Sequence, residues 1–303
     1  MTTVFIDGSA GTTGLRIHER LAEREDIELI TLSEEKRKDA DARREALNSA
    51  DIAFLCLPDA AAVEAVGMIN TNTRVIDTST AHRTAPGWEY GFPELTGRRE
   101  RIANAARVAN PGCHASGFIA LVAPLVEAGV ISKDAELTCF SLTGYSGGGK
   151  KMIAEYESAG RDKLMDAPRM YGLSQTHKHL PEMAAVTGLL NAPVFCPIVA
   201  PYYAGMEVTV PLTGVDPGAI REVYGEYYTG GLVKFVDGAD EGGFLSAMAY
   251  AGRDDMEISV FGNCDRVILT ARFDNLGKGA SGAAIQNMNI MLGVPEGRGL
   301  IIH

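Results

Sequence analysis

The 303-residue sequence has no excess of positive charge. It carries 28 lysines and arginines against 39 aspartates and glutamates, which gives a formal net charge of −11 at pH 7. A chain with this balance repels a phosphate backbone, because it has too few cations to release the counterions that drive such binding. The charge therefore argues against nucleic acid as a partner.

Long apolar runs are also missing. No stretch reaches the roughly 18 residues that suggest a membrane span. The first residues, MTTVFIDGSAGTTG, lack the basic segment and apolar run of a targeting signal. Both absences predict a cytoplasmic chain with no membrane partner. Its hydrophobic content of 46% suffices for the cores of two modest domains or one large domain.

Cysteine is scarce, and no two cysteines form a Cys-x-x-Cys pair. The five stand far apart, at positions 56, 113, 139, 196 and 264. The odd number and the wide spacing argue against a disulfide framework and a zinc site, so we expect no metal. Cys56 and Cys139 lie inside strand-like apolar runs, where a free cysteine behaves as a small hydrophobe. Cys113 differs, because it follows a Pro-Gly turn and precedes a helical pattern.

The first 110 residues alternate strand and helix patterns in the manner of a doubly wound parallel sheet. The strand-like runs are TVFID, IELITL, DIAFLCL, RVIDTST and RVAN. Helix-like segments such as LRIHERLAE and DAAAVEAVGMI separate them, without an internal repeat or a flexible linker. One loop-rich stretch, TAPGWEYGFPELTGRRER, is expected to hang over one end of the sheet, and such loops often border active sites.

Three glycines in the first turn, Gly8, Gly11 and Gly14, form a G-x-x-G-x-x-G pattern between the first strand and the first helix. Such a turn lets the backbone approach a pyrophosphate, and the helix N-terminus offers unpaired N–H donors to its charge. We therefore predict that these glycines, with Thr12 and Thr13, bind a dinucleotide. The alternative is a structural turn that binds nothing.

The residues after the second predicted strand leave the identity of this dinucleotide open. Glu34, 20 residues beyond Gly14, could bind the ribose 2′-hydroxyl of NAD. Ser33, Lys36 and Arg37 could instead hold the 2′-phosphate of NADP. The residues alone support both interpretations.

Cys113 lies at the predicted start of a helix. Pro111 and Gly112 end a strand, and the apolar positions between Phe118 and Val126 have helical spacing. The positive end of a helix dipole favours a thiolate, so such a cysteine can have a pKa of roughly 3.5 to 7.5 instead of about 8.5. We therefore predict that Cys113 is a nucleophile. The alternative is a small residue that fills the entry to a buried helix.

A nucleophile beside a nicotinamide suggests an aldehyde-level reaction, in which sulfur holds an acyl group and hydride then reaches the thioester carbon. Such a reaction needs an acid/base. Of the six histidines, His177 and His179 in SQTHKHLPEM are the best candidates, because they precede a proline that can start a helix and lie in surroundings that we expect to be exposed. The alternative is a pair of surface loop residues.

The second half of the chain has a different pattern. Six strand-like runs alternate poorly with helices: AELTCFSL, VFCPIVA, MEVTVPL, LVKFVD, MEISVFG and RVILTARFD. This predicts a mostly antiparallel sheet in a second, α+β domain. The segment GASGAAIQNMNIML is expected to be a final, largely buried helix, since its small residues permit close packing.

Five motifs occur in order along essentially the whole chain: GSAGTTG, NPGCHASG, TGYSGGGK, HKHLPEM and FDNLGKGASGAAIQNMNIMLG. As an ordered set they resemble the N-acetyl-gamma-glutamyl-phosphate reductases of arginine biosynthesis, in their shorter form. The resemblance implies a Rossmann domain at 1–112, completed by a C-terminal helix at 280–303. It also implies a catalytic and oligomerisation domain of the semialdehyde dehydrogenase type at 113–279, and a homo-oligomer that is a dimer or a tetramer.

The resemblance also assigns roles to individual residues. Cys113 is the nucleophile, and the family pattern H-x-H-x-P-E favours His179 as the acid/base, with His177 binding substrate. NADP is favoured as the cofactor, with Asn275 near the nicotinamide. The glycines before Lys150 form an anion-friendly loop, for which the alternative is a flexible hairpin. The expected substrate contacts are Arg83 for a carboxylate, Gly147 and Lys150 in the loop, and Asn110 and Ser146.

One stretch departs from the family. After the fourth strand the longer members tend to read DLSADFRL, whereas this chain reads DTSTAHRT, so its acyl-group specificity can differ. The implied reaction is the NADPH-dependent reduction of N-acetyl-L-glutamyl 5-phosphate to the 5-semialdehyde through a cysteine thioester. Two alternatives stay open. One is a related reductase acting on an amino-adipyl or aspartyl phosphate, and the other is a non-catalytic regulator that senses the dinucleotide.

Overall fold

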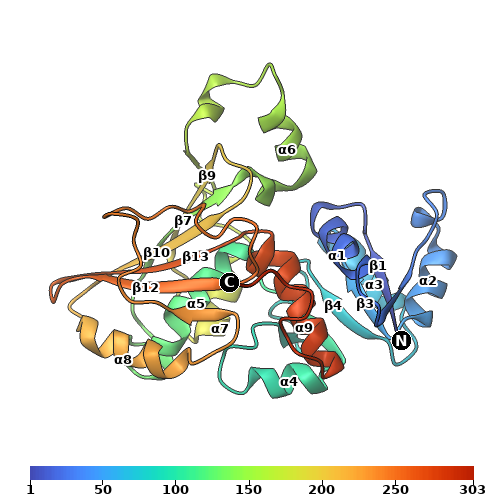
Figure 1. Ribbon diagram of the computed structural model, residues 1–303, viewed down its shortest axis with the longest axis horizontal. Coiled ribbons are helices and arrows are strands. Elements are labelled where there is room, and N and C mark those ends of the chain that lie inside the picture. The colour runs from blue at the N-terminus through green and yellow to red at the C-terminus, as the bar shows by residue number, and fades with distance from the viewer. The chain divides into compact units, whose positions relative to one another are not determined.

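The computed structural model describes residues 1–303 and divides into two compact units (Figure 1). Unit 1 comprises Met1–Pro111 and Ala280–Leu300, and unit 2 comprises Gly112–Gly279 and Ile301–His303. Unit 2 is therefore inserted into unit 1 along the chain. The division differs from the sequence expectation at Gly112 and in the last three residues, which had been placed with the first domain and belong to unit 2.

Hydrogen bonds within unit 2 hold this C-terminal tail. The N–H of Asp254 donates to the carbonyl of Ile301, and the N–H of Ile301 donates to the Asp254 carboxylate, both at 2.8 Å. Lys234 and Arg253 donate to the carbonyl of His303 at 3.0 and 3.1 Å. The sequence pattern ended with a helix and carried no sign of these contacts.

Unit 1 is built on a six-stranded parallel sheet with the strand order β2-β1-β3-β4-β6-β5. The strands are β1 (Thr2–Asp7), β2 (Ile27–Ile30), β3 (Ile52–Leu55), β4 (Arg74–Asp77), β5 (Glu89–Tyr90) and β6 (Arg107–Ala109). The helices are α1 (Thr12–Ala22), α2 (Ala40–Ser49), α3 (Asp59–Met68), α4 (Arg98–Asn104) and α9 (Gly282–Leu292). The doubly wound prediction is confirmed, and the stretch predicted as a loop supplies β5 and the first turn of α4.

Both faces of this sheet are packed. Successive residues of a strand point to opposite faces, so Val4 and Ile6 join one apolar cluster and Phe5 joins another. The first cluster includes residues from three helices: Ile17 and Leu21 of α1, Ile102 of α4, and Ile285 and Met288 of α9. The C-terminal helix α9 therefore packs on one face of the sheet of unit 1.

Unit 2 contains a seven-stranded sheet with the order β11-β12-β13-β10-β7-β9-β8. The strands are β7 (Thr138–Gly144), β8 (Arg169–Met170), β9 (Val194–Ala200), β10 (Met206–Thr213), β11 (Val233–Phe235), β12 (Met256–Gly262) and β13 (Arg266–Phe273). The helices are α5 (Cys113–Glu127), α6 (Gly149–Glu157), α7 (Leu180–Thr187) and α8 (Pro217–Tyr227). Most strand pairs are antiparallel, as predicted, but β7 pairs parallel with β9, and β11 with β12.

Helix α5 is anchored in the middle of its length. Pro124 has no N–H, so the carbonyl of Ala120 lacks its helical donor. The hydroxyl of Tyr228 donates to that carbonyl at 2.7 Å, and the hydroxyl of Tyr224 donates to the carbonyl of Leu121. Tyr228 therefore compensates for the proline, and both tyrosines fix the helix that begins with the candidate nucleophile.

One face of the unit 2 sheet carries exposed apolar side chains. Gly117 of α5 lies against Val208, so α5 covers the face on which Val208 lies. The next residue along β10, Thr209, points to the opposite face together with its partner Phe140. On this opposite face Phe140 is 38% exposed and Ile268 is 43% exposed. An apolar sheet face of this kind is a candidate interface.

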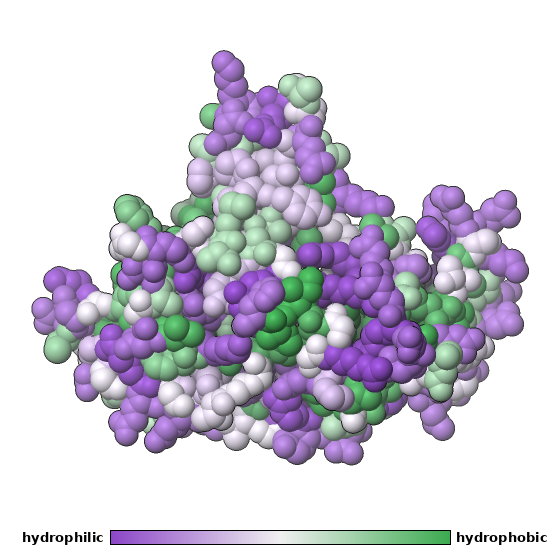
Figure 2. Space-filling view, viewed as in Figure 1, coloured by the Kyte–Doolittle hydropathy of each residue, from purple (hydrophilic) through white to green (hydrophobic).

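An arm projects from the unit 2 sheet between β7 and β9. It includes the 3₁₀ turns η2 (Tyr145–Gly148) and η3 (Lys163–Asp166) on either side of α6. Its own small cluster contains Tyr156 and Met165, which pack with Val199 of β9. Figure 2 shows mainly hydrophilic side chains at the tip of this arm. In neither unit does a helix have the length and apolar content needed to cross a bilayer.

Candidate active site

The cysteines differ in their surroundings. Cys113 is partly exposed and is the first residue of α5, with Gly112 as the N-cap. Burial raises the pKa of Cys56 to about 12 and also raises the pKa of Cys139. Cys264 is exposed, but it follows strand β12 and has no helix behind it. Cys113 combines access with a helix N-terminus, which stabilises a thiolate.

Gly279 shapes the backbone beside this cysteine. It belongs to a π-helical turn, η4 (Gly277–Ser281), and a Cβ atom at Gly279 would lie 3.0 Å from the Cβ of Cys113. Any larger residue would therefore crowd the nucleophile. The contact also means that the two ends of the inserted segment, at Cys113 and Gly279, touch each other.

His177 and His179 come together with His114 of α5. The ring centroids lie 5.7 Å apart for His114 and His177, 5.5 Å for His114 and His179, and 4.7 Å for His177 and His179. Helix α7 begins at Leu180 with Pro181 in its first turn, as predicted, and it packs against α5. This packing buries His179, which is 5% exposed, so the expectation of exposed surroundings is wrong for it.

Glu182 is a site residue that the sequence reasoning did not single out. Its carboxylate is 1% exposed and accepts a hydrogen bond of 3.1 Å from the N–H of Gly112, at the N-terminus of α5. Its other oxygen lies 4.0 Å from Nε2 of His179. Glu182 therefore links the helix of the candidate nucleophile to the candidate acid/base. The pattern H-x-H-x-P-E contained this residue, and its spacing from His179 on one helix face could have identified it.

The ring of His114, the residue that follows Cys113, also lies in the histidine cluster. Nδ1 shares a hydrogen bond of 2.7 Å with the hydroxyl of Ser141, and Nε2 shares one of 2.7 Å with the hydroxyl of Tyr171. Burial, together with the charge of His177, lowers the pKa of His114 to about 3. Sequence reasoning missed Ser141 and Tyr171, because their segments are far from Cys113 along the chain.

The structure brings Ser146 and Asn275 together. The side-chain amide of Asn275 donates to the Ser146 hydroxyl at 2.9 Å and accepts from the N–H of Gly205 at 3.0 Å. The segment with Gly147 and Lys150 is a 3₁₀ turn that leads into α6, so the flexible-hairpin alternative is wrong. Gly147 and Lys150 are exposed there.

The glycine turn of unit 1 connects β1 to α1. Gly8 has a φ of +89°, and a Cβ atom there would lie 2.2 Å from the carbonyl oxygen of Cys56. Gly11 is the N-cap of α1, and Thr12 and Thr13 are its first residues. The N–H groups of this first turn have no helical partners and favour an anion.

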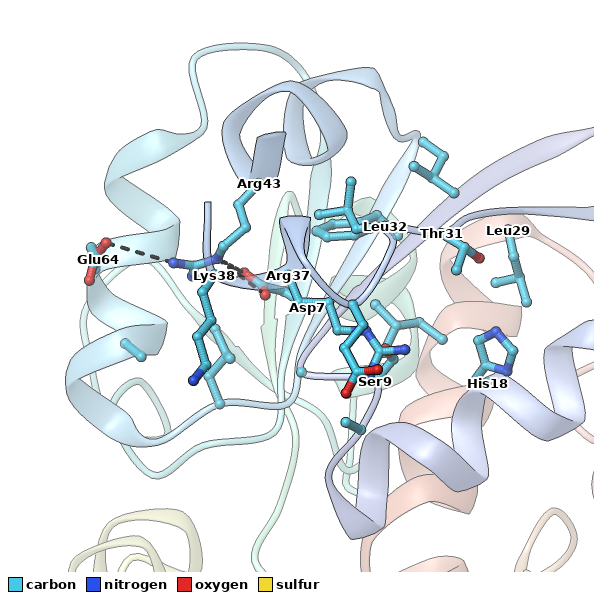
Figure 3. A pocket seen from close by; sticks show the side chains of 18 residues that line it. Asp7, Ser9, His18, Leu29, Thr31, Leu32, Arg37, Lys38, Arg43 and Glu64 are labelled. Atoms are coloured by element: carbon cyan, nitrogen blue, oxygen red, sulfur yellow. Dashed lines mark hydrogen bonds and ion pairs between the residues drawn. The ribbon is translucent and has the colours of Figure 1, made fainter. Parts of the chain in front are cut away.

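A cavity of about 640 Å³ lies beside this turn and is lined by Gly8, Ser9 and Ala10 (Figure 3). Two cations of the 3₁₀ turn η1 (Lys36–Lys38) line it, namely Arg37 and Lys38. Ser33 and Lys36 do not line it, which corrects the predicted cluster. A 3₁₀ turn of about three residues per turn points adjacent side chains in different directions, and the sequence alone did not reveal this turn.

Acidic residues line the same cavity. Figure 3 shows Arg43 of α2 pointing toward Asp7 and Glu64. Arg43 donates to both oxygens of Asp7, at distances between 2.9 and 3.3 Å, and it lies 3.7 Å from Glu64. Glu34 also lines the cavity. Because Asp7 engages Arg43, the charges of Arg37 and Lys38 are the ones positioned to meet an anionic ligand.

The loop after β4 holds the predicted substrate residues Arg83 and Asn110 together. The guanidinium of Arg83 donates to the carbonyl of Asn110 at 3.0 Å and to that of Thr78 at 3.2 Å. In the same loop Nδ1 of His82 lies 2.6 Å from the buried carboxylate of Asp77. Two backbone carbonyls thus accept hydrogen bonds from the guanidinium of Arg83. The contact of Arg83 with a substrate carboxylate stays a prediction.

No group of three or more histidine, cysteine or acidic side chains has an arrangement that could hold a metal ion. His114, His177 and His179 instead pack ring against ring, and the rings of His114 and His177 share hydrogen bonds with Ser141 and with the N–H of His179. The arrangement offers a candidate nucleophile, imidazoles and a buried carboxylate, which are groups suited to acyl chemistry.

Comparisons with known proteins agree with this geometry. Residues 3–105 match the semialdehyde dehydrogenase NAD binding domain, and residues 113–275 match the semialdehyde dehydrogenase dimerisation domain. The chain is 48% identical to N-acetyl-gamma-glutamyl-phosphate reductase 2 of Nostoc sp., with 98% of each chain covered. It is 47% identical to N-acetyl-gamma-glutamyl-phosphate reductase of Brucella suis, covering 96% of this chain and 98% of that protein.

Solved structures with a similar fold are more distant in sequence. Aspartate semialdehyde dehydrogenase II of Vibrio cholerae superposes with a TM-score of 0.72 at 16% identity, covering 96% of this chain and 98% of that chain. A probable aspartate-semialdehyde dehydrogenase of Pseudomonas aeruginosa gives a TM-score of 0.70 at 18% identity, with the same coverage. These likenesses establish the architecture of the two units.

Proposed function

Since the chain belongs to the family of N-acetyl-gamma-glutamyl-phosphate reductases, we propose that it reduces N-acetyl-L-glutamyl 5-phosphate to the 5-semialdehyde through a thioester on Cys113. The observation that carries the proposal is the position of Cys113, at the N-terminus of α5 and adjacent in sequence to the histidine cluster. A thiolate at this position is a nucleophile for an acyl phosphate.

The first step forms the thioester. His179 takes the proton of the Cys113 thiol, and the sulfur attacks the acyl carbon as the carbon–oxygen bond to phosphate breaks. His179 then gives the proton to the departing phosphate, so no charge is left on the imidazole. Glu182 is suited to orient His179, because the two groups lie 4.0 Å apart on the first turn of α7.

The second step reduces the thioester. A bound nicotinamide dinucleotide supplies the hydride for this reduction. The resulting tetrahedral oxyanion collapses to the aldehyde as the carbon–sulfur bond breaks, which releases the Cys113 thiolate. A proton from solvent restores the thiol for the next turnover, so the sequence consumes one proton overall.

Substrate contacts are proposed on the residues nearest to these groups. His177 lies beside His179 and is suited to bind substrate oxygen. The exposed turn at Gly147, with Lys150 in the first turn of α6, offers N–H donors and a cation to a phosphate. Asn275 and Ser146 form one hydrogen-bonded pair, and together they can present polar atoms to substrate or cofactor.

Unit 1 binds a nicotinamide dinucleotide, and we propose NADP in particular. The glycine turn and the cavity beside it fit such a cofactor, because the cavity has room for the adenosine portion and is lined by Gly8, Ser9 and Ala10 of the turn that leads into α1. Arg37 and Lys38 would hold the 2′-phosphate, since both line the cavity and neither forms an ion pair.

Oligomer formation is proposed on the open face of the unit 2 sheet. The matched segment 113–275 is a dimerisation domain, and this face exposes Phe140 and Ile268. A second copy would cover these side chains. Light scattering should give at least twice the chain mass for the wild type, and Phe140→Asp should reduce that mass. An unchanged assembly in the variant would place the interface elsewhere.

The thioester is tested by trapping it. Incubated with acyl phosphate and no cofactor, the protein should gain the mass of one acyl group on the peptide that contains Cys113. A panel of N-acetylglutamyl, amino-adipyl and aspartyl phosphates should show which acyl chain is preferred. An acyl group on any other cysteine, or none with all three substrates, would contradict the proposal.

A further inference from the structure

Arg43 lines the cavity of unit 1, but the proposed contacts with the cofactor give it no role. It belongs to helix α2, and its side chain is 11% exposed. Its Nε and Nη2 atoms both donate to the carboxylate of Asp7, and the Nη2 contact measures 2.9 Å. Its Nη1 atom lies 3.7 Å from the carboxylate of Glu64. Each nitrogen of the guanidinium therefore has a carboxylate beside it.

These contacts leave the flat faces of the guanidinium as the part that a ligand can meet. The N–H groups of a guanidinium all lie in its plane, so Asp7 and Glu64 occupy its edges (Figure 3). Asp7 is 4% exposed, and breaking a buried ion pair is strongly destabilising, because it leaves an uncompensated charge. Asp7 therefore fixes the plane of the guanidinium and keeps its donors from a phosphate.

The dinucleotide fold indicates which part of the cofactor the cavity receives. In such folds the pyrophosphate meets the glycine turn, and the ribose of the adenosine half meets residues about 20 positions later. Arg37 and Lys38, proposed for the 2′-phosphate of that ribose, line the cavity, so the attached adenine is expected there as well. Leu32 and Leu57 add apolar side chains to its wall. The cavity is thus suited to a flat, weakly polar ring.

Aromatic side chains contribute little to the lining near Arg43. Phe5 is 3% exposed, and Figure 3 shows His18 across the cavity from Arg43. A guanidinium can take the place of an aromatic ring, because it is planar, delocalised and weakly hydrated, and nucleic-acid bases stack on it. Arg43 is the lining residue whose guanidinium plane is fixed by a buried carboxylate.

We propose that Arg43 binds the adenine ring of the cofactor on the face of its guanidinium, and that Asp7 is the positioning residue that holds this face in place. This inference rests on the proposed cofactor site and names the group that recognises the base. Arg37 and Lys38 then distinguish NADP from NAD by the 2′-phosphate. Arg43 acts on the adenine, which both cofactors carry, so it strengthens the binding of both by the same factor.

The test measures the binding of NADPH and NADH by calorimetry, with the full chain and no substrate. Arg43→Lys keeps the positive charge and a partner for Asp7, but it has no flat face. The Kd values of both cofactors should rise by about fivefold to tenfold, and by the same factor. The loss should persist in added salt, because adenine carries no charge to screen. Wild-type binding by this variant, or a loss confined to NADPH, would overturn the proposal.

A change of base separates stacking from bracing of the cavity. The probe is an NADH analogue in which cytosine replaces adenine, so that the phosphates are the same. The wild type should bind NADH more tightly than the analogue, since a purine offers a larger face. In Arg43→Lys this preference should shrink by about threefold. A residue that only braces the cavity would lower the affinity for both ligands alike, and an unchanged preference would therefore overturn the proposal.

Controls keep this result separate from folding and from the proposed reaction. Arg44→Lys changes the next residue of α2, which pairs with Asp41 and does not line the cavity, and it should leave every Kd unchanged. If Arg43→Lys does not fold, Arg43→Gln keeps a donor for Asp7 and takes its place in the same comparison. Binding needs no acyl phosphate, so a failure of the proposed substrate leaves these outcomes readable. Equal wild-type affinities for NADPH and NADH would contradict the proposed NADP preference but not the role of Arg43.

Discussion

The two units present charge to their ligands in opposite ways. Unit 1 lines its cavity with exposed groups, with Arg37 and Lys38 on one short turn and Glu34 nearby. Unit 2 buries the polar groups of its candidate site, where His179 and Glu182 are 5% and 1% exposed. Exposed charges are screened by salt, and each contributes up to about 1 kcal/mol. Removing the partner of a buried polar group costs about 1–3 kcal/mol. A substitution at the site of unit 2 is therefore expected to cost more free energy than one at the cavity of unit 1.

The largest expected effect is at Cys113. Cys113→Ser preserves the shape of the side chain, but a hydroxyl stays protonated where a thiol ionises. Turnover should fall by at least about a thousandfold, while NADPH binding, measured by fluorescence, stays near the wild-type value. If the serine variant kept substantial activity, the assignment of the chemistry to unit 2 and of cofactor binding to unit 1 would be contradicted.

Next in size are the two histidines of unit 2. His179→Ala should lower kcat by about a hundred to ten thousandfold, because it removes the acid/base. His177→Ala should mainly raise KM, because it removes a binding group. Steady-state kinetics at saturating NADPH separates the two. The reverse pattern would exchange their roles, and two variants with wild-type kinetics would contradict both assignments.

A third prediction concerns the stability of unit 2 in acid. His114 has a pKa of about 3 in the folded chain and an ordinary value near 6.5 when unfolded. Between these values the unfolded state binds a proton that the folded state excludes, so stability falls as the pH drops from 6.5 toward 3. The slope from this residue approaches about 1.4 kcal/mol per pH unit.

Hydrogen exchange of the α5 amides measures this slope locally. His114→Gln has no titrating group and should show a smaller loss of protection between pH 6.5 and 4. An identical pH dependence in both proteins would mean that other groups dominate the acid response. No such dependence is expected for α1 of unit 1, which provides the internal comparison.

The smallest effects are expected at the cavity of unit 1. Lys38→Ala and Arg37→Ala should each raise KM for NADPH by about threefold to tenfold, and added salt should diminish the difference from wild type. KM for NADH should change less. Lys36→Ala, on the same turn but outside the cavity, should leave both values nearly unchanged. Equal losses for both cofactors would show that the turn does not read the 2′-phosphate.

The same contrast explains how much the sequence could predict. The alternation of strands and helices predicted the sheet of unit 1, and the glycine spacing predicted its first turn, because both depend on residues close together in the chain. The helix start at Cys113 followed from the same kind of local signal. Periodicity and turn residues sufficed wherever the structure is local.

What the sequence could not predict depends on contacts between distant segments. The approach of Ser141 and Tyr171 to His114 requires the packing of α5 against β7 and the parallel pairing of β7 with β9, and neither has a local signature. The burial of His179 also depends on distant segments, because it results from the packing of α7 against α5. Lys36 was predicted at the cofactor site, but Lys38 lines the cavity instead. The reason is a 3₁₀ turn, whose side-chain directions differ from those of an α-helix.

The contact between Cys113 and Gly279 bears on whether unit 1 can be produced without unit 2. Residues 112–279, which form most of unit 2, are inserted between Pro111 and Ala280 of unit 1. Their two ends lie close together, and within unit 1 the side chain of Asn110 donates to the carbonyl of Ala280 at 3.0 Å. A short linker from Pro111 to Ala280 should therefore close unit 1 into a continuous chain. That chain retains α9, and with it both packed faces of the sheet, so a nucleotide-binding module could be produced without its catalytic insert. Such an architecture lets one catalytic insert be exchanged for another while the host sheet stays intact.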